Sequence, residues 1–193
     1  EMISFRRKLV LYSGGQTNRN YHLHQALVDL VDHNRQISMT YIPYCYSGHK
    51  KYYLRAINRY KKFGVTKFHC MPVDRPISTE SLKKTLNSDI IYLAGGNTFY
   101  FLMHLQKSKM LNPLYNYVKA GGVLAGLSAG ALIMTPDIRL AGYPTFDCDD
   151  NEVGLRNLKS LGLVEAEFFP HLDNSKRLHE ALIKYSKKSK HPL

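Results

Sequence analysis

The most specific chemical signal in this 193-residue sequence is the pentapeptide Gly126-Leu127-Ser128-Ala129-Gly130. It follows an apolar run at 122–125 and precedes another at 131–134, which is the strand–turn–helix context of a G-x-S-x-G nucleophile elbow. Glycines are needed at both ends because side chains there would clash in a tight turn that strains the serine backbone. We predict that Ser128 is an exposed nucleophile and that the N–H of Ala129, at a helix start, stabilises an oxyanion. The alternative is a glycine-rich helix start that Ser128 only caps.

A nucleophilic serine needs a base, and His171 is the best candidate among nine histidines. It lies in Phe168-Phe169-Pro170-His171-Leu172-Asp173, which we predict to follow a strand and precede a helix. Most of the other histidines fall on or beside predicted helices, inside a predicted strand or in the tail. Asp173 is only two residues from His171 and poorly placed to face its ring, so we assign no third residue to the pair.

A second glycine-rich turn, Gly95-Gly96-Asn97-Thr98, also follows a predicted strand and opens a predicted helix. Its backbone N–H groups could bind a carboxylate, a phosphate or an oxyanion. It lacks the spacing of the P-loop and of the dinucleotide-binding fingerprint. The alternative is a plain tight turn.

The elements that position these residues alternate between strands and helices. We predict strands at 8–13, 36–43, 65–72, 89–94, 122–127 and 163–169, and helices at 21–33, 48–63, 78–86, 98–106, 113–119, 128–134, 152–161 and 174–188, with a loop at 136–151. This alternation predicts one α/β domain, over residues 1–193, with a mainly parallel sheet. Ligands bind such sheets at the carboxyl ends of the strands, where the serine and both turns fall.

Composition narrows the class of protein. The excess of 27 Lys+Arg over 15 Asp+Glu gives a net charge of +12, concentrated in segments 50–67 and 176–190. Such faces are either solvated helix surfaces or attract acidic ligands. No nucleic-acid motif accompanies them, so we do not expect a nucleic-acid partner. Three separate cysteines, Cys45, Cys70 and Cys148, indicate neither a zinc site nor a disulfide framework. The apolar runs are too short for a membrane span or a signal peptide, so we expect a cytoplasmic protein.

Three motifs in order carry a resemblance: residues 92–99, residues 126–131 about thirty positions later, and Phe169-Pro170-His171. Together they resemble the peptidase E family, the aspartyl-dipeptidase-like serine peptidases related to cyanophycinase. The resemblance extends from the first strand to the last helix. It implies a three-layer α/β sandwich similar to class I glutamine amidotransferases, with serine in place of their cysteine. It further implies hydrolysis of short peptides, dipeptides with an N-terminal Asp above all, without a metal or organic cofactor.

The resemblance also assigns site residues. Four positions match the family's catalytic groups: the nucleophile Ser128, the general base His171, and the oxyanion donors Gly96 and Ala129. Asn97 is expected to bind substrate. Arg139 lies in the segment that helps aspartyl dipeptidase read an acidic side chain, and a guanidinium binds a carboxylate in bidentate fashion. The alternative for Arg139 is an exposed loop cation.

The sequence departs from the family at its end. In the family the orienting acid lies in a turn beyond the last helix, and this sequence ends at Leu193 about where the next strand would begin. We therefore expect that acid, and one or two strands, to lie outside this sequence; the alternative is a protein that works with a Ser–His dyad. The loop carrying Asp147, Asp149, Asp150 and Glu152 is expected to close over the site rather than supply the acid.

Other functions remain open at this point. A cyanophycinase-like hydrolase would share the same site. An esterase or lipase would share the elbow but should show an HGGG-type loop and a cap, and a glutaminase would need cysteine at position 128. A basic, non-enzymatic binding protein on the same fold is the remaining alternative, and a homodimer is one possible assembly.

Overall fold

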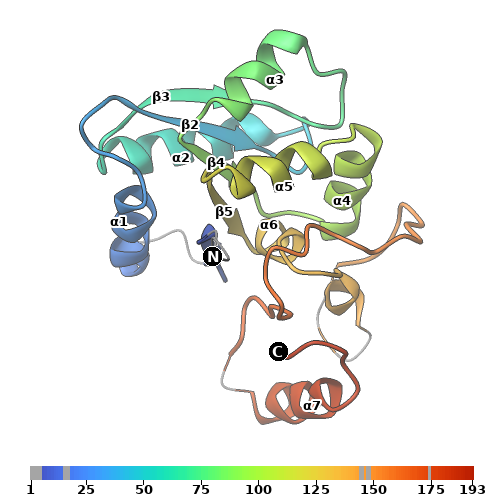
Figure 1. The fold of residues 1–193 in the computed structure, drawn as a ribbon. Helices are drawn as coiled ribbons and strands as arrows, with labels where there is room; N and C mark the ends of the chain where they lie inside the picture. The colour runs from blue at the N-terminus through green and yellow to red at the C-terminus, as the bar shows by residue number, and fades with distance from the viewer. Residues whose placement is uncertain (1–5, 15–17, 144–145, 147–148, 174) are drawn as a thin grey trace, which may run out of the picture.

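The computed structural model describes residues 6–14, 18–143, 146, 149–173 and 175–193. Within them, a five-stranded sheet has the order β1-β5-β4-β2-β3 (Figure 1). Every pairing in it is parallel, which confirms the predicted sheet. The strands are β1 (Lys8–Tyr12), β2 (Ile37–Ile42), β3 (Val65–Cys70), β4 (Ile90–Leu93) and β5 (Val123–Leu127). Because β5 lies between β1 and β4, the turns that follow these three strands meet at one edge.

Helices cover both faces of the sheet, so the fold is an α/β sandwich (Figure 1). One face packs against α1 (Tyr21–Asp29) and α2 (His49–Lys61), and the other against α3 (Thr79–Leu86), α4 (Thr98–Lys107), α5 (Leu111–Lys119) and α6 (Ala129–Ile133). The helix α7 (Lys176–Ser186) lies apart from the sheet, beyond the short 3₁₀ helix η2 (Arg139–Gly142). Another 3₁₀ turn, η1 (Asn18–Asn20), precedes α1, which ends at Asp29 rather than at the predicted His33.

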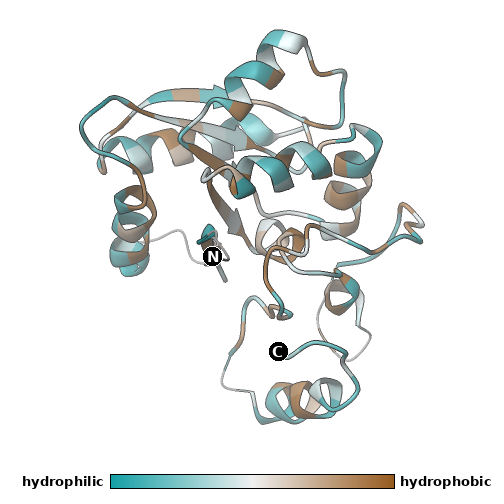
Figure 2. Cartoon of the chain, viewed as in Figure 1, coloured by the Kyte–Doolittle hydropathy of each residue, from teal (hydrophilic) through white to brown (hydrophobic). Residues whose placement is uncertain are grey.

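The two apolar cores explain why the strands read as continuous hydrophobic runs. All four residues of β4 are buried, with Ile90 and Tyr92 in the core beside α1 and α2, and Ile91 and Leu93 in the core beside α3 to α6. A parallel strand covered on both faces has no solvated side, so its sequence does not alternate. Figure 2 shows hydrophobic residues gathered on β5 and α6, next to the predicted site.

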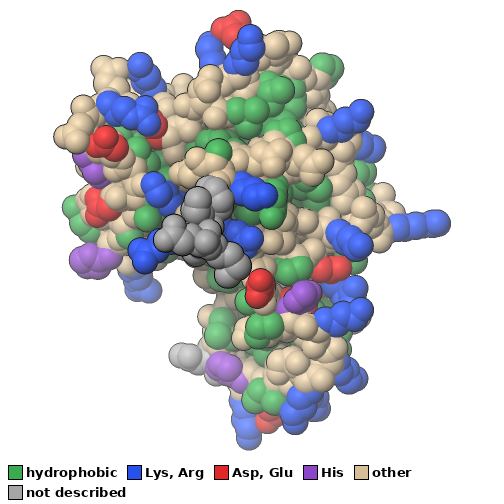
Figure 3. Space-filling model, in the orientation of Figure 1, with side chains coloured by type: hydrophobic (Ala, Val, Ile, Leu, Met, Phe, Trp, Pro, Cys, Tyr) green, Lys and Arg blue, Asp and Glu red, His purple; other side chains and the backbone are tan. Residues whose placement is uncertain are grey.

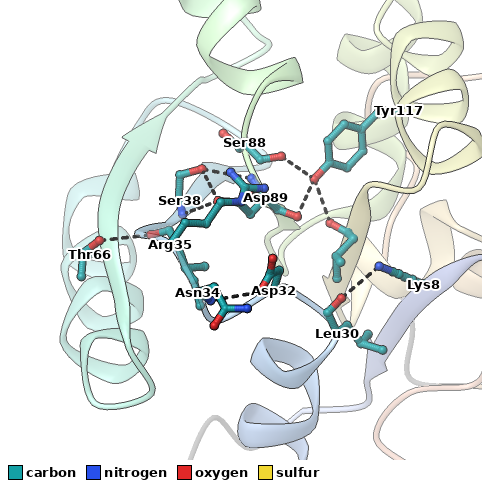
Figure 4. A network of polar contacts seen from close by, with 12 residues as sticks. Lys8, Leu30, Asp32, Asn34, Arg35, Ser38, Thr66, Ser88, Asp89 and Tyr117 are labelled. Carbon is teal, nitrogen blue, oxygen red and sulfur yellow. Dashed lines mark hydrogen bonds and ion pairs between the residues drawn. The ribbon is translucent and has the colours of Figure 1, made fainter.

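A network of hydrogen bonds and an ion pair connects the amino ends of β2 and β4 (Figure 4). The Asp89 carboxylate, only 3% exposed, accepts hydrogen bonds from the Ser38 backbone N–H (2.8 Å) and hydroxyl (2.9 Å), and pairs with the Arg35 guanidinium. The Tyr117 hydroxyl lies 2.8 and 2.9 Å from the carbonyl oxygens of Ser88 and Asp89. A buried carboxylate needs such partners to remain charged. This network links β2, β4 and α5 at the end of the sheet opposite to the site.

The predicted helix at 152–161 is wrong. The Asn151 side chain binds both the N–H (2.8 Å) and the carbonyl (2.9 Å) of Leu155, and Gly154 adopts a left-handed φ of 62°. Local side-chain bonds of this kind compete with helix formation. The segment runs as turns and extended chain beside α4 and the residues that follow α6, with an isolated bridge between Asp137 and Lys159. Its leucines still pack on the core, so their spacing indicated burial and not a helix.

The predicted strand at 163–169 is also wrong. The N–H groups of Leu161, Gly162 and Leu163 donate to carbonyl oxygens at the end of α6, and Glu167 N–H donates to the Pro192 carbonyl (2.7 Å). The segment therefore lies on a helix end and on the tail, and among the described residues it pairs with no strand. A short segment containing apolar and aromatic residues forms a strand only where another strand is available to pair with it.

Two remaining predictions concern cysteines and membranes. Cys45 and Cys70 are free, and burial raises the pKa of the Cys70 thiol to about 12, which suppresses its reactive thiolate; Cys148 lies outside the described residues. Within the described parts of the chain, none of the helices combines the length and the apolar character that crossing a bilayer requires.

Candidate active site

The turns that follow three neighbouring strands, β1, β5 and β4, lie at one edge of the sheet. After β5 comes Ser128, after β1 come Ser13 and Gly14, and after β4 come Gly95 and Gly96. In parallel sheets this carboxyl edge is where ligands bind. The predicted catalytic residues therefore share one location because of strand order rather than sequence spacing.

Ser128 occupies a strained turn between β5 and α6, with φ 51° and ψ −104°. A Cβ on Gly126 would lie 2.4 Å from the Gly130 carbonyl, and a Cβ on Gly130 would lie 2.2 Å from the Leu93 carbonyl oxygen. The backbone itself is tied to β1, since Ser128 N–H donates to the Tyr12 carbonyl at 2.8 Å. The Ser128 side chain makes no capping hydrogen bond to α6. Ser128 therefore lies in a strained turn between a strand and a helix, and its side chain does not cap that helix.

The structure brings His171 to Ser128, with Nε2 and Oγ 2.8 Å apart. The β1 turn holds the histidine, because its N–H donates to the Ser13 hydroxyl (2.8 Å). Its ring also lies so close to Gly14 that an added Cβ there would be 2.8 Å from Cε1 and Nδ1. His171 itself has a left-handed φ of 60° in an irregular segment. Its proximity to the serine thus comes from β1, and not from the strand predicted before it.

The hydrogen-bond partners of the other ring nitrogen, Nδ1, bear on how the His171 ring is oriented. Among the described residues, no side chain accepts a hydrogen bond from this nitrogen. The carboxylate of Asp173 instead accepts from the Ser175 N–H at 2.7 Å, in a local turn. Ser13 and Gly14 are therefore the groups that the structure places to orient His171, and the sequence offered no signal for them beyond their position after the first strand.

The two predicted oxyanion donors are the backbone N–H groups of Ala129, which follows the serine, and of Gly96, which lines a cavity with it. Ala129 is the first residue of α6, and Gly96 has a φ of 144°, where a Cβ would enter the Tyr44 ring at 2.1 Å. Within the described chain, neither N–H has a backbone or side-chain acceptor. Donors of this kind can stabilise negative charge on an oxygen that Ser128 attacks.

Ser128 and His171 lie where two cavities meet, of about 430 and 530 Å³. Both volumes are in the range of small-ligand sites. The first, here called the Arg177 cavity, contains charges of both signs: Asp149, Asp173 and Arg177. The second, here called the Arg55–Arg59 cavity, contains those two arginines and three tyrosines: Tyr41, Tyr52 and Tyr92. Among the described side chains, no three of His, Cys, Asp or Glu gather as a metal site would require.

The acidic loop lies against the second glycine-rich turn. Asp149 accepts hydrogen bonds from the N–H (2.7 Å) and hydroxyl (2.5 Å) of Thr98, and the Asp150 carbonyl accepts from the Asn97 side chain (3.0 Å). Through Asp149 this loop forms part of the Arg177 cavity. Asp147 lies outside the described residues, and Glu152 is exposed beyond the docked part of the loop.

The two predicted substrate-binding residues lie elsewhere. Asn97 caps α4, since its side-chain oxygen accepts from the Tyr100 N–H (2.9 Å), and its amide nitrogen holds the Asp150 carbonyl. Arg139 is 65% exposed and its guanidinium lies 3.4 Å from the Asp137 carboxylate. Neither side chain lines the two cavities described above. For Arg139 the reason is that η2 buries Leu140 and Ala141 and leaves Arg139 in solvent.

Arginines that the sequence did not single out line the cavities instead. Arg177 comes from the start of α7, and Arg55 and Arg59 come from α2. The only sequence signal for them was membership of the two basic segments, which also contain exposed lysines. Basic charge alone could not separate these arginines from their neighbours.

Comparison with solved structures defines the class of protein. The fold is that of a peptidase E: it matches the crystal structure of a candidate peptidase E protein from Listeria monocytogenes EGD-e with a TM-score of 0.71 and 25% identity, covering 93% of this chain and 88% of that one. The sequence is 37% identical over 103 residues to the uncharacterized peptidase Lmo0363 of Listeria monocytogenes, covering 51% of this chain and 49% of that protein. It is 34% identical over 88 residues to peptidase E of Salmonella arizonae, covering 46% of this chain and 36% of that protein.

The family follows from the whole sequence. The model of peptidase family S51 matches residues 9–192, and the chain belongs to this family. This confirms the resemblance inferred from the three motifs. The matched part of the chain spans about half or less of those two curated relatives.

The close packing of the turn at Ser128 predicts how glycine substitutions change the free energy of unfolding. Gly130→Ala should lower the free energy of unfolding by about 2 kcal/mol or more, because its methyl group would overlap the Leu93 backbone. Gly95→Ala is the matched control, since its Cβ would lie 3.4 Å or more from Leu127 in ordinary contact, and should change stability by less than about 1 kcal/mol. Urea unfolding measures both. Equal effects would show that the turn is not closely packed.

Proposed function

We propose that the protein is a serine peptidase that hydrolyses short peptides, in particular dipeptides with an N-terminal Asp, through an acyl-enzyme on Ser128. The observation that carries the proposal is the 2.8 Å contact between Ser128 Oγ and His171 Nε2 in a strained turn. Membership of family S51 supports the class of reaction. A strained nucleophile beside a base, with donors on either side, is the arrangement that acyl transfer needs.

The mechanism follows from the positions of these groups. His171 Nε2 accepts the Ser128 proton as Oγ attacks the peptide carbonyl carbon, and the resulting oxyanion is stabilised by the N–H groups of Gly96 and Ala129. Each such donor contributes about 3–4 kcal/mol in serine hydrolases. The tetrahedral intermediate then expels the amine, which takes the proton from His171. Water repeats the sequence to release the acid and restore Ser128.

The Arg177 cavity supports selection of an N-terminal acidic residue. Such a residue carries an ammonium group and a side-chain carboxylate a few bonds apart. Arg177 can pair with the carboxylate, and the carboxylates of Asp149 and Asp173 face the same cavity as partners for the ammonium. The surface charge acts in the same sense, since Lys and Arg side chains are scattered over the face in Figure 3, several of them at the α7 end.

Replacing the nucleophile tests the reaction. Ser128→Ala should lower kcat for Asp-Leu by more than about a thousandfold while leaving the unfolding transition unchanged, because the hydroxyl is the attacking group. Ser47→Ala, an exposed serine outside both cavities, should keep full activity. Release of leucine measures the rate. A Ser128→Ala protein with several per cent of the wild-type rate would remove this serine from the mechanism.

Substrate charge tests the specificity. Asp-Leu should exceed Asn-Leu in kcat/KM at least about tenfold, even at 1 M salt, where the screening length falls to about 3 Å and only a direct contact persists. Arg177→Gln should remove most of this preference. Arg139→Gln removes the same charge from an exposed position and should retain it. If wild type cleaves both dipeptides equally, or if Arg177→Gln keeps the preference, Arg177 does not read an acidic side chain.

A further inference from the structure

The Arg55–Arg59 cavity differs from the Arg177 cavity in the sign of its charge. Arg55 and Arg59 are four residues apart on α2, so they point from the same side of the helix. Among the described residues, no Asp or Glu lines this cavity, whereas two acids line the other. The Arg55–Arg59 cavity therefore favours an anion, and the Arg177 cavity favours a group with both charges.

The tyrosines that line the Arg55–Arg59 cavity are consistent with its preference for an anion. Tyr41 and Tyr92, stacked with centroids 5.7 Å apart and planes at 12°, are buried residues of β2 and β4. Burial raises the pKa of Tyr41 far above its ordinary value, so its phenol stays neutral and adds no negative charge. The Arg55 guanidinium lies 5.8 Å from the Tyr52 ring and has no acidic partner in the described chain. An anionic ligand would thus meet a guanidinium that no carboxylate neutralises.

The positively charged Arg55–Arg59 cavity adjoins the proposed catalytic residues. It shares Ser128 and His171 with the Arg177 cavity, and it contains Gly96, one of the proposed oxyanion donors. It lies toward the α1 and α2 face, whereas Leu132 and Ala141, which belong to the opposite core, place the Arg177 cavity toward the other side of the sheet. A peptide whose scissile carbonyl sits at Ser128 therefore extends into both cavities, one on each side of the bond.

We infer that the Arg55–Arg59 cavity binds the free C-terminal carboxylate of the substrate, with Arg55 and Arg59 as the residues that read it. This inference rests on the proposed function and adds a second specificity determinant to it. In a dipeptide, the N-terminal acidic residue occupies the mixed-charge cavity and the C-terminal residue presents its carboxylate to the two arginines. A longer peptide places a neutral amide there, so the same contact selects for dipeptides.

The test compares Asp-Leu with Asp-leucinamide, which has a neutral C-terminus of nearly the same shape. Wild type should prefer the free acid at least tenfold in kcat/KM. Arg55→Gln with Arg59→Gln should bring the ratio of the two substrates close to one. Lys61→Gln is the matched control, because it removes a charge from the same helix at an exposed position outside both cavities and should keep the ratio. Equal turnover of acid and amide by wild type, or a preference that survives the double substitution, would overturn the inference.

Binding to Ser128→Ala separates this inference from the proposed function. Calorimetry should show tighter binding of Asp-Leu than of Asp-leucinamide, with the difference lost when Arg55 and Arg59 are also replaced by Gln. If wild type cleaves neither peptide but this difference in binding is present, the proposed function fails and the carboxylate site stands. If wild type cleaves both equally, the carboxylate site fails and the peptidase stands. If neither peptide binds with a preference for the free acid, the carboxylate site is overturned.

Discussion

The arrangement of the site depends on the close approach of two backbones beneath Ser128. Gly130 fits against the Leu93 carbonyl, and Gly126 fits against Gly130, with no room for a Cβ at either position. This contact places the serine at the end of the central strand β5, so that β4 contributes Gly96 on one side and β1 contributes the Ser13 and Gly14 turn on the other. The proposed base and one proposed oxyanion donor are thus positioned by the two strands beside β5, and the core around them maintains the strained backbone of Ser128.

The two cavities beside Ser128 differ in the charges of the residues that line them. One cavity is lined by Arg177, Asp149 and Asp173, whereas the other is lined by Arg55 and Arg59 and, among the described residues, by no Asp or Glu. In the proposed function each charge of the dipeptide meets an opposite charge in a defined place, which gives specificity more than affinity. The net charge of +12 reinforces this by attracting acidic peptides at long range, but salt screens that attraction and leaves the local contacts.

The sequence predicted the strands and helices up to residue 134 because each had a strong apolar pattern with a glycine, a proline or a capping residue at its end. It failed at 152–169, where leucines spaced for burial pack as irregular chain against the end of α6. Ser128 could be identified because its chemistry and its packing requirement lie in one local motif. Four other residues of the site could not be identified from the sequence, because only the strand order and the docking of α7 bring them to the serine: Ser13, Gly14, Arg55 and Arg177. Arg139 matches the family's acid-reading segment in sequence, but η2 leaves its side chain exposed to solvent.

The central claim is that Ser128 is a nucleophile activated by His171, and covalent labelling tests it most directly. With diisopropyl fluorophosphate, Ser128 Oγ should form a bond to phosphorus as fluoride leaves and His171 takes the proton. Peptide mapping by mass spectrometry should then find one phosphoryl adduct, on the peptide that contains Ser128, and Asp-Leu should slow its formation. His171→Ala should abolish the adduct at matched times. An unmodified Ser128 in the folded wild-type protein, or a label confined to another residue, would contradict the account.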